Sequence, residues 1–335
     1  MNGEIVKPGG LVTIFGGSGF VGRYVVRALA QRGWRIRVAS RRPDLAFHLQ
    51  PLGAVGQIHA VQANVRYPES VAHALRDAQA AINLVGIMHE RGEQRFDVIH
   101  HLGAENIGKA AREAGIRIFV QMSAIGVDPS AASAYARTKA FGEAAVRQVT
   151  PDAIIMRPSV IFGPEDQFFN RFAVMARLMP ALPLIGEGKT KFQPVFVGDV
   201  AEAIALAIAG KAVPGTTYEL GGPEIVTLRQ VFTFILSATG RNRRLVPLSF
   251  KSAATVAIVT ETMHKLSLGL FPETFVITSD QVKLLREDNI VSPSADADGR
   301  TFHGFGISPE PYEAIVPSYL YRYRTAGQFA GTRGG

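Results

Sequence analysis

Three side chains in the middle of the chain have the types and spacing that proton transfer requires. Tyr135 and Lys139 stand four residues apart in the segment YARTK, so on a helix they share one face. Ser123 ends the strand pattern that precedes them. In a nucleotide-dependent reductase, a lysine lowers the pKa of the tyrosine, the tyrosine moves a proton to or from the substrate oxygen, and a serine orients that oxygen. We predict that these three residues are catalytic; the alternative is an ordinary amphipathic helix with exposed Tyr and Lys.

A glycine-rich turn near the N-terminus indicates a nucleotide site. An apolar run from Val12 leads into GGSGFVG and then into a helical pattern, which is the arrangement that a dinucleotide pyrophosphate needs. Gly16 is expected to make the tight turn, and Gly22 to let the helix pack on the strand. Gly17 and Gly19 are expected to let backbone N–H groups approach the phosphates, whereas the alternative is a plain loop. The predicted contacts are Gly16, Gly17, Ser18, Gly19, Phe20, Val21 and Gly22.

The residues after the second strand pattern predict which nucleotide is bound. An NAD-binding chain places an Asp or Glu about 20 residues beyond the glycines, to hold the ribose 2′-hydroxyl. Here the corresponding residues are Ser40, Arg41 and Arg42. Two guanidinium groups suit a 2′-phosphate, so Arg41 and Arg42 predict NADP(H); the alternative is a solvated loop.

Short apolar runs and helical patterns alternate through the first half of the chain, which predicts an α/β fold: a Rossmann-type, doubly wound parallel sheet. Strands are expected at Trp34 to Ser40, Gln57 to Ala63, Ala80 to Val85, Ile116 to Ser123 and Ala153 to Arg157, and helices at Glu69 to Arg76, Asp97 to Ala114 and Ala134 to Val149. Ligands of such sheets lie at the carboxyl ends of the strands. We therefore expect further cofactor contacts from Asn64, Val65, Leu84, Val85, Gly86, Lys139 and Pro158.

Beyond residue 162 the elements become shorter and Pro and Gly more frequent. We predict an NADP(H)-binding core over residues 1–162, a substrate or partner region over 163–330 that shares the sheet, and a frayed tail over 331–335. Extended pieces are expected at Phe192 to Val197, Thr217 to Leu220 and Leu245 to Pro247, and helices at Val200 to Ala209 and Leu228 to Thr239.

Composition excludes several classes of function. The chain has 335 residues, 47% of them hydrophobic, so it can bury a large core. Its net charge of +8 is spread along the sequence in short clusters, which argues against nucleic-acid binding. Cysteine is absent, which removes disulfides and thiolate chemistry, and fits a reducing compartment. The histidines show no metal-ligand spacing, and the side chains of the pair His100-His101 would diverge on a helix.

We expect a cytoplasmic protein without a transmembrane segment. The N-terminal segment MNGEIVKPGG has neither an apolar signal core nor the features of a transit peptide, and no run of 18 apolar residues occurs. The nearest approach is Ala253 to Phe271, which is broken by polar residues. Its main interpretation is a helix packed on its own protein, and the minority one is a membrane-surface or partner-docking helix.

Together these motifs resemble a known superfamily. The glycine turn, the Ser, Tyr and Lys set and the turn Arg157-Pro158-Ser159 are similar to the extended or atypical short-chain dehydrogenases/reductases. The segments FGGSGFVGRYVVRAL, INLVG, SAYARTKAFGE, IIMRPSVIFGPEDQFFNRFA and QPVFVGDVAEAI resemble, more specifically, the alpha subcomplex subunit nine family of complex I accessory subunits and its bacterial relatives. The resemblance covers most of the chain to about Ala209 and thins afterwards.

The resemblance implies a tightly bound NADPH, with Gly16, Gly19, Gly22 and Arg41 at the nucleotide and the Ser, Tyr and Lys set beside the nicotinamide. It also implies a structural role for the mitochondrial members, with no turnover assigned. Two departures from the wider pattern matter. The spacing from serine to tyrosine is shorter than in many sugar-nucleotide epimerases. This makes a sugar-nucleotide epimerase a less favoured interpretation of the chain. Asn64 replaces an Asp of many relatives, although its amide can still bond adenine.

Two functions are consistent with these observations. The first is a reductase in which NADPH gives a hydride to a small, apolar carbonyl, enoyl or quinone-like substrate and Tyr135 gives the proton. Its pocket would draw on Phe168, Phe169, Phe172 and Met175, a stripe that is more often core. The second is a non-catalytic NADPH-binding scaffold or assembly factor, peripherally associated with a respiratory complex on the cytoplasmic face of the inner membrane.

Overall fold

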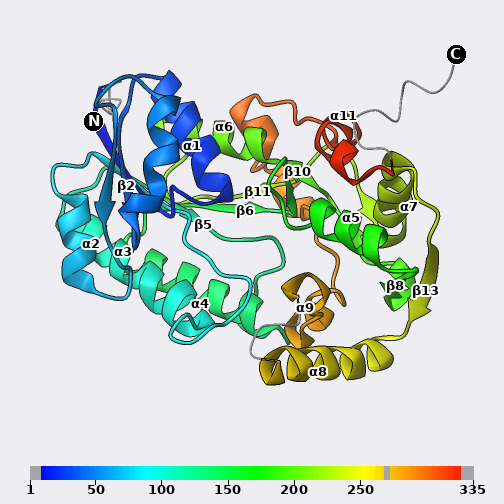
Figure 1. The fold of residues 1–335 in the computed structure, drawn as a ribbon. Helices are drawn as coiled ribbons and strands as arrows, with labels where there is room; N and C mark the ends of the chain where they lie inside the picture. The colour runs from blue at the N-terminus through cyan, green and yellow to red at the C-terminus, as the bar shows by residue number, and fades with distance from the viewer. Residues whose placement is uncertain (1–8, 268–271, 326–335) are drawn as a thin grey trace, which may run out of the picture. The chain divides into compact units, whose positions relative to one another are not determined.

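The computed structural model describes residues 9–267 and 272–325, and its central element is a seven-stranded sheet in which every pair is parallel (Figure 1). The strand order β3-β2-β1-β4-β5-β6-β11 reverses direction between β1 and β4, which confirms the predicted doubly wound sheet. The strands are β1 (Leu11–Phe15), β2 (Arg35–Ser40), β3 (Ile58–Gln62), β4 (Ala80–Asn83), β5 (Ile118–Met122), β6 (Ile154–Pro158) and β11 (Thr217–Leu220).

Helices cover both faces of this sheet. On one face α1 packs against α6, and on the other α2, α3 and α4 form a row (Figure 1). Each helix buries an apolar stripe, as α1 does with Val25, Val26 and Leu29, so the sheet is apolar on both sides. The helices are α1 (Phe20–Gln31), α2 (Pro68–Leu75), α3 (Gly103–Glu113), α4 (Ala134–Val149) and α6 (Val197–Ile208), with a 3₁₀ segment, η1, at Pro43–Leu52.

The helix predicted from Asp97 to Ala114 has two parts. It begins with a π-helical turn, η2 (Asp97–Leu102), and only then continues as α3. Helix α4 approaches this turn so closely that a side chain at Gly142 would collide with the carbonyl oxygen of His100. The wide turn and the glycine together bring His100 against the helix that carries Tyr135 and Lys139.

The chain forms two compact units that alternate along the sequence. The first contains Met1–Pro158, Val197–Leu220 and Val291–Ser308, and the second contains Ser159–Phe196, Gly221–Ile290 and Pro309–Gly335. The domain division after residue 162 stays a prediction; within these units, β11 and α6 lie with the N-terminal part because β11 pairs with β6. The predicted tail, 331–335, lies outside the described residues.

The second unit is built from helices and three two-stranded pairs, β7 with β10, β9 with β12 and β8 with β13. The predicted helix Leu228 to Thr239 is α7, whereas α5 and β8 were not predicted. Phe169 is fully buried, and Phe168 and Phe172 pack beside it in an aromatic core. The bounds are α5 (Phe169–Leu178), α7 (Leu228–Thr239), α8 (Phe250–Leu266), α9 (Ser279–Leu284), β7 (Ile161–Phe162), β8 (Ala181–Ile185), β9 (Lys191–Phe192), β10 (Val195–Phe196), β12 (Val226–Thr227) and β13 (Arg244–Leu248).

Three short helices follow in the chain: α10 (Pro293–Ala297), which lies in the first unit, and α11 (Tyr312–Ile315) and α12 (Pro317–Leu320), which lie in the second. Within 9–267 and 272–325, no helix combines the length and hydrophobicity needed to cross a bilayer. The apolar stretch predicted from Ala253 to Phe271 is helical as α8 to Leu266, and its residues 268–271 lie outside the described part of the chain.

Candidate functional site

The glycine turn between β1 and α1 lies against the segment that follows β4. Gly16 has a φ of +80°, and a Cβ there would lie 3.1 Å from the carbonyl carbon of Leu84 and 3.2 Å from the amide nitrogen of Val85. A Cβ at Gly22 would collide with the Gly16 carbonyl oxygen, so glycine at both positions lets the helix, the turn and the β4 end approach closely. The structure thus brings together four of the residues predicted to bind the nucleotide.

Gly17 and Gly19 also have packing and turn-forming contacts within the chain. A Cβ at Gly17 would press on Val38 Cγ1 at 3.1 Å and on Ile14 Cγ2 at 3.3 Å, so this glycine lets the turn pack on the sheet. The N–H of Gly19 donates to the Gly16 carbonyl at 3.1 Å and shapes the turn itself. Their contacts with the phosphates stay a prediction.

The N-terminus of α1 fits an anionic group. In this described segment, no side chain caps the helix and its first turn, which includes Phe20 and Val21, contains no acidic residue. The partial positive charge of the helix dipole at this end is therefore not neutralised by a side chain of the helix. A pyrophosphate at such an end bonds the amide groups and gains from the dipole.

The residues after β2 and β3 differ in whether their side chains already make ion pairs or hydrogen bonds within the chain. Arg42 is exposed and makes a two-pronged ion pair with Asp44, at 2.8 and 3.1 Å, and Arg41 beside it is also exposed. Asn64 accepts hydrogen bonds through Oδ1 from the backbone N–H of Arg66 at 3.2 Å, which fixes the turn after β3. Val65 is buried in the core of the first unit.

Tyr135 and Lys139 lie on one face of α4, as their spacing predicts. Lys139 Nζ is 5.9 Å from the centre of the Tyr135 ring and donates to the Met122 carbonyl, at the end of β5, at 3.3 Å. A Cβ at Gly86, after β4, would lie 3.5 Å from the same Nζ. The buried ammonium group therefore lies where the ends of β4 and β5 meet, at the carboxyl edge of the sheet.

Ser123, the residue after Met122, carries an unused polar atom. Its side chain is buried, and its Oγ has no hydrogen-bond partner among the described residues. Buried hydroxyl groups in proteins are almost always bonded, because leaving one unbonded costs about 1–3 kcal/mol. A polar ligand atom that reaches this end of β5 would satisfy it, so the residues present fit a bound nicotinamide nucleotide.

Burial sets the protonation of both groups on α4. It lowers the pKa of Lys139 to about 8, and the carboxylate of Glu143 opposes this fall. It raises the pKa of Tyr135 to about 12, a net change opposite in direction to the lowering expected from the lysine. Tyr135 consequently remains a proton donor at neutral pH, whereas Lys139 titrates just above it.

His100 completes the surroundings of Tyr135 and Lys139. Its Nε2 accepts from the Ile87 N–H at 3.0 Å, so the other ring nitrogen, Nδ1, carries the hydrogen that Thr138 Oγ1 accepts at 3.2 Å. Burial and the neighbouring charge of Lys139 lower the pKa of the imidazole to about 3. The ring also meets that of Tyr135 edge-on, with centroids 5.3 Å apart. A neutral His100 thus joins the segment after β4 to α4.

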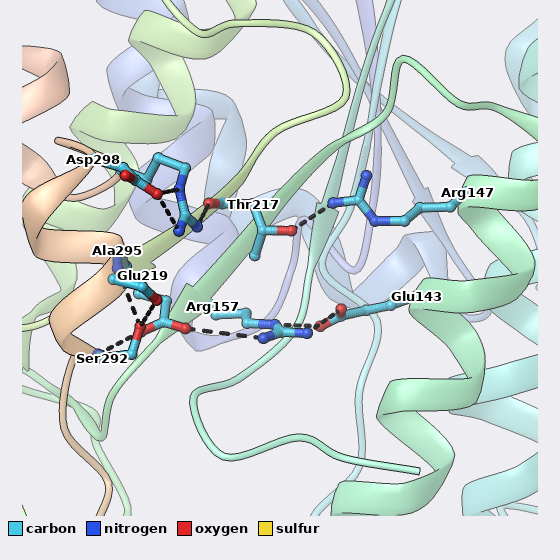
Figure 2. Close-up of polar contacts among 10 residues, drawn as sticks. Glu143, Arg147, Arg157, Thr217, Glu219, Ser292, Ala295 and Asp298 are labelled. Atoms are coloured by element: carbon cyan, nitrogen blue, oxygen red, sulfur yellow. Dashed lines mark hydrogen bonds and ion pairs between the residues drawn. The ribbon is translucent and has the colours of Figure 1, made fainter.

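An ion-pair network holds α4 in place through Glu143, one turn beyond Lys139 (Figure 2). Arg157 of β6 donates to both carboxylate oxygens of the buried Glu143, at 2.9 and 2.6 Å, and lies 3.9 Å from Glu219 of β11. Glu219 in turn accepts from the backbone N–H of Ser292 at 2.7 Å. These contacts join four segments that are distant in sequence: α4, which carries Tyr135 and Lys139, β6, β11 and the segment at Ser292.

The family model for the NAD dependent epimerase/dehydratase family matches residues 12–221, which is more than half of the chain and includes the sheet except for its first residue, Leu11. The chain belongs to this family. The glycine turn, α4 and all but that residue of the seven-stranded sheet lie within the match, so the fold of this epimerase/dehydratase family member is of the NAD(P)-binding type.

Among named relatives, the chain is similar to the mitochondrial NADH dehydrogenase [ubiquinone] 1 alpha subcomplex subunit 9 of Arabidopsis thaliana. The two are 34% identical over 327 residues, which is 96% of this chain and 80% of the relative. It is also 35% identical to the ceramide reductase of Caulobacter vibrioides over 179 residues, 53% of this chain and 55% of that one. The resemblance to the complex I accessory subunit family is therefore confirmed.

A solved structure shows the same fold at lower identity. The NADPH-dependent quinone oxidoreductase of Escherichia coli, solved with NADPH, superposes with a TM-score of 0.71 at 19% identity, covering 92% of this chain and 99% of that one. This likeness establishes the architecture and leaves substrate and nucleotide preference open.

Two parts of the site in this epimerase/dehydratase family member were not predicted from the sequence. The sequence indicates no metal-ligand role for His100, and it gives no sign of the hydrogen bonds that His100 makes with Ile87 and Thr138. The Glu143–Arg157 pair joins residues 14 apart on different elements. A charged residue inside a strand pattern, as Arg157 is, was the available signal, because a charge enters a sheet interior only with a partner.

Proposed function

We propose that this chain is an NADP(H)-dependent reductase that acts on a small apolar carbonyl or quinone-like substrate. The observation that carries the proposal is the buried Ser123 Oγ, which has no hydrogen-bond partner in residues 9–267 and 272–325 and lies at the strand edge where Lys139 is also buried. A nucleotide site used only for stability needs no hydroxyl group, proton donor and ammonium group gathered at one point.

The side chains divide the proton chemistry between them. When bound, the nicotinamide would supply the hydride that reaches the carbonyl carbon. Ser123 would donate a hydrogen bond to the substrate oxygen, and the protonated Tyr135 would transfer its proton to that oxygen as negative charge develops there. The Lys139 ammonium would stabilise the tyrosinate that remains, until a proton from solvent restores the phenol.

Sequence similarity supports a reductase with an apolar substrate. The relative from Caulobacter vibrioides is named a ceramide reductase, and ceramides combine a polar head with long hydrocarbon chains. The direct test is to add purified protein to NADPH with a panel of quinones, ketones and long-chain oxo compounds. NADPH oxidation that depends on one substrate class supports the proposal, and bound NADPH that no member of the panel oxidises contradicts it.

The nucleotide preference depends on Arg41 more than on Arg42. The guanidinium group of Arg42 is already paired with Asp44, so Arg41 is the better donor for a 2′-phosphate. A hydrogen bond between charged groups contributes about 1.5–3 kcal/mol, so Arg41→Ala is expected to weaken NADPH binding by roughly 10- to 100-fold. Binding of NADH, which has no 2′-phosphate, is expected to change by less than about threefold; titration calorimetry measures both.

Arg42→Ala is the matched control, and it is expected to cost less NADPH affinity than Arg41→Ala. Equal losses of NADPH and NADH binding in Arg41→Ala would contradict the 2′-phosphate assignment. A larger loss in Arg42→Ala would show that the Asp44 pair opens for the nucleotide.

Lys139 predicts the pH dependence of the reduction. Its pKa of about 8 means that the ammonium form dominates below pH 8 and is lost above it, whereas Tyr135, with a pKa of about 12, stays protonated. Because kcat/KM reports groups of the free enzyme, kcat/KM for NADPH should be level up to about pH 7, fall to about half at pH 8 and approach a tenfold fall per pH unit above about pH 9. A profile that stays level to pH 10 would exclude a required Lys139 ammonium.

A second candidate function follows from the other relatives. The chain is 34% identical over almost its whole length to a subunit of a mitochondrial respiratory complex, so a non-catalytic role in a respiratory complex on the cytoplasmic face of the inner membrane is the competing proposal. NADPH would then stabilise the fold by mass action. Co-purification with the respiratory complex from detergent-solubilised membranes, with analysis of bound nucleotide, supports this role if the complex is recovered and contradicts it if the protein is recovered alone.

A further inference from the structure

Helix α8 of the second unit is apolar on two opposite faces. Ala253 and Ala257 are buried in a small core with Ile185 and Val282. On the outer side, four large apolar side chains are 49–79% exposed: Ile258, Val259, Met263 and Leu266. Positions 258, 259, 263 and 266 lie on one side of the helix, which we call the α8 outer face, and the exposed Thr255 and Thr262 lie among them. A surface helix in water normally presents polar residues on that side.

Behind α8 the second unit contains an apolar cavity of about 510 Å³. Val256 and Thr260 of α8 form one wall, and Met175 and Leu182, from α5 and β8, form another. The volume lies within the range of small-ligand sites. Thr260 is the polar member of the lining, and its hydroxyl already donates to the Ile277 carbonyl at 2.9 Å. The cavity therefore suits a hydrocarbon chain rather than a ligand that needs hydrogen bonds.

The segment that carries this face is strongly basic. Residues 241–267, which include β13 and α8, contain five Lys or Arg residues and one acidic residue, Glu261. The Glu261 carboxylate accepts from the backbone N–H and the hydroxyl of Ser279, at 2.8 and 3.1 Å. Arg244 and Lys251 are exposed on the same segment, as is the apolar Val246. Exposed apolar residues in a segment with an excess of basic over acidic residues are typical of helices that lie in an anionic lipid interface.

We propose that β13 and α8 form a membrane-surface anchor for anionic phospholipid, with the α8 outer face in the bilayer interface and a lipid acyl chain in the cavity behind it. The basic residues of the segment favour anionic phospholipid, because the phosphate groups of an anionic bilayer complement their charge. The acyl chains of the lipid match both the apolar outer face and the apolar cavity. The anchor does not rest on the reductase function, because lipid binding is measured without nucleotide or substrate.

Flotation of the full chain with vesicles tests the surface contact. Binding to vesicles of 30% phosphatidylglycerol in phosphatidylcholine is expected to exceed binding to pure phosphatidylcholine by about tenfold, and to weaken in 0.5 M salt because basic residues contribute. Placing two carboxylates on the outer face, in Ile258→Glu/Met263→Glu, should reduce binding to the anionic vesicles by at least about tenfold.

The matched control is Val55→Glu/Val213→Glu, which makes the same charge change at two exposed apolar residues of the first unit. It should bind like the wild type, and unchanged thermal unfolding should show that both variants fold. If the control variant lost vesicle binding to the same extent, the change in net charge alone would explain the loss. This result would exclude the proposed anchor. Wild-type protein that floats with neither vesicle, but is retained by a solubilised membrane protein complex, would overturn it in favour of a protein partner.

Tryptophan quenching tests the cavity. Phe275 also lines it, and the natural tryptophan, Trp34, is buried in the first unit. In Phe275→Trp, phosphatidylglycerol vesicles with dibrominated acyl chains should quench the new fluorescence by about half or more, while wild-type emission from Trp34 is unchanged; Val256→Trp serves if Phe275→Trp fails to fold. Equal quenching in wild type and variant, or no quenching in either, would exclude an acyl chain from the cavity.

Discussion

Replacing Tyr135 by Phe is expected to reduce the turnover of NADPH with its substrate by about 10²- to 10⁴-fold, the usual contribution of a positioned proton donor. The phenyl ring keeps the edge-on contacts with His100 and Phe96, so α4 and its neighbours should remain in place. The variant loses the hydroxyl group, and with it the proton that Tyr135, with its pKa of about 12, holds at neutral pH. Stopped-flow or steady-state absorbance at the NADPH band measures the change.

NADPH affinity separates this effect from a disturbed site. It should differ by less than about twofold between wild type and Tyr135→Phe, because the nucleotide contacts expected at Gly16, Gly22 and Arg41 are untouched. Tyr67→Phe, at an exposed tyrosine of the same unit, is the control and should turn over like the wild type. Undiminished turnover in Tyr135→Phe would exclude the tyrosine as the proton donor, and unchanged growth of cells that carry it would favour the scaffold role.

The parts of the site that follow from local pattern could be predicted from the sequence. Strand and helix periodicity placed β1 to β6 and α4, and parallel strands necessarily bring their carboxyl ends to one edge. This rule predicts that Gly16, Gly86 and Ser123 lie near each other, and the spacing in YARTK adds Lys139 from the following helix. The conformation of Gly16 followed from the tight turn, because glycine readily adopts a positive φ.

The parts that depend on burial and on distant partners could not be predicted. The pKa of Tyr135 rises because its surroundings remove water, and no spacing rule reports how deeply a side chain is buried. His100 gained its role from a π-helical turn, which differs from an α-helix by one residue in its bonding and has no periodic signature. The packing of Gly17 on Val38 is likewise a contact that only the three-dimensional structure reveals.

Burial also makes the Glu143–Arg157 ion pair behind α4 a large expected contribution to stability. Arg157→Met would leave the buried Glu143 carboxylate without the two bonds that it now accepts, at 2.9 and 2.6 Å. Breaking a buried pair from one side costs about 3–5 kcal/mol, and because about a quarter of the Arg157 side chain is exposed we expect about 2–3 kcal/mol here. Differential scanning calorimetry and urea unfolding, followed in the first unit by the fluorescence of Trp34, measure the loss.

Removing both charges should cost less than removing the arginine alone. In Glu143→Leu/Arg157→Met the Glu143 carboxylate is no longer buried without a partner, and Glu219 keeps its bond from the Ser292 N–H, so part of the lost stability should return. Arg147→Met, on the same helix, removes bonds only to Gly215 and Thr217 and leaves no charge stranded, so its cost should be smaller than that of Arg157→Met. If the double variant were as unstable as the sum of the two single variants, the pair would not be coupled, and Glu219 rather than Glu143 would be the residue that holds Arg157 in the sheet.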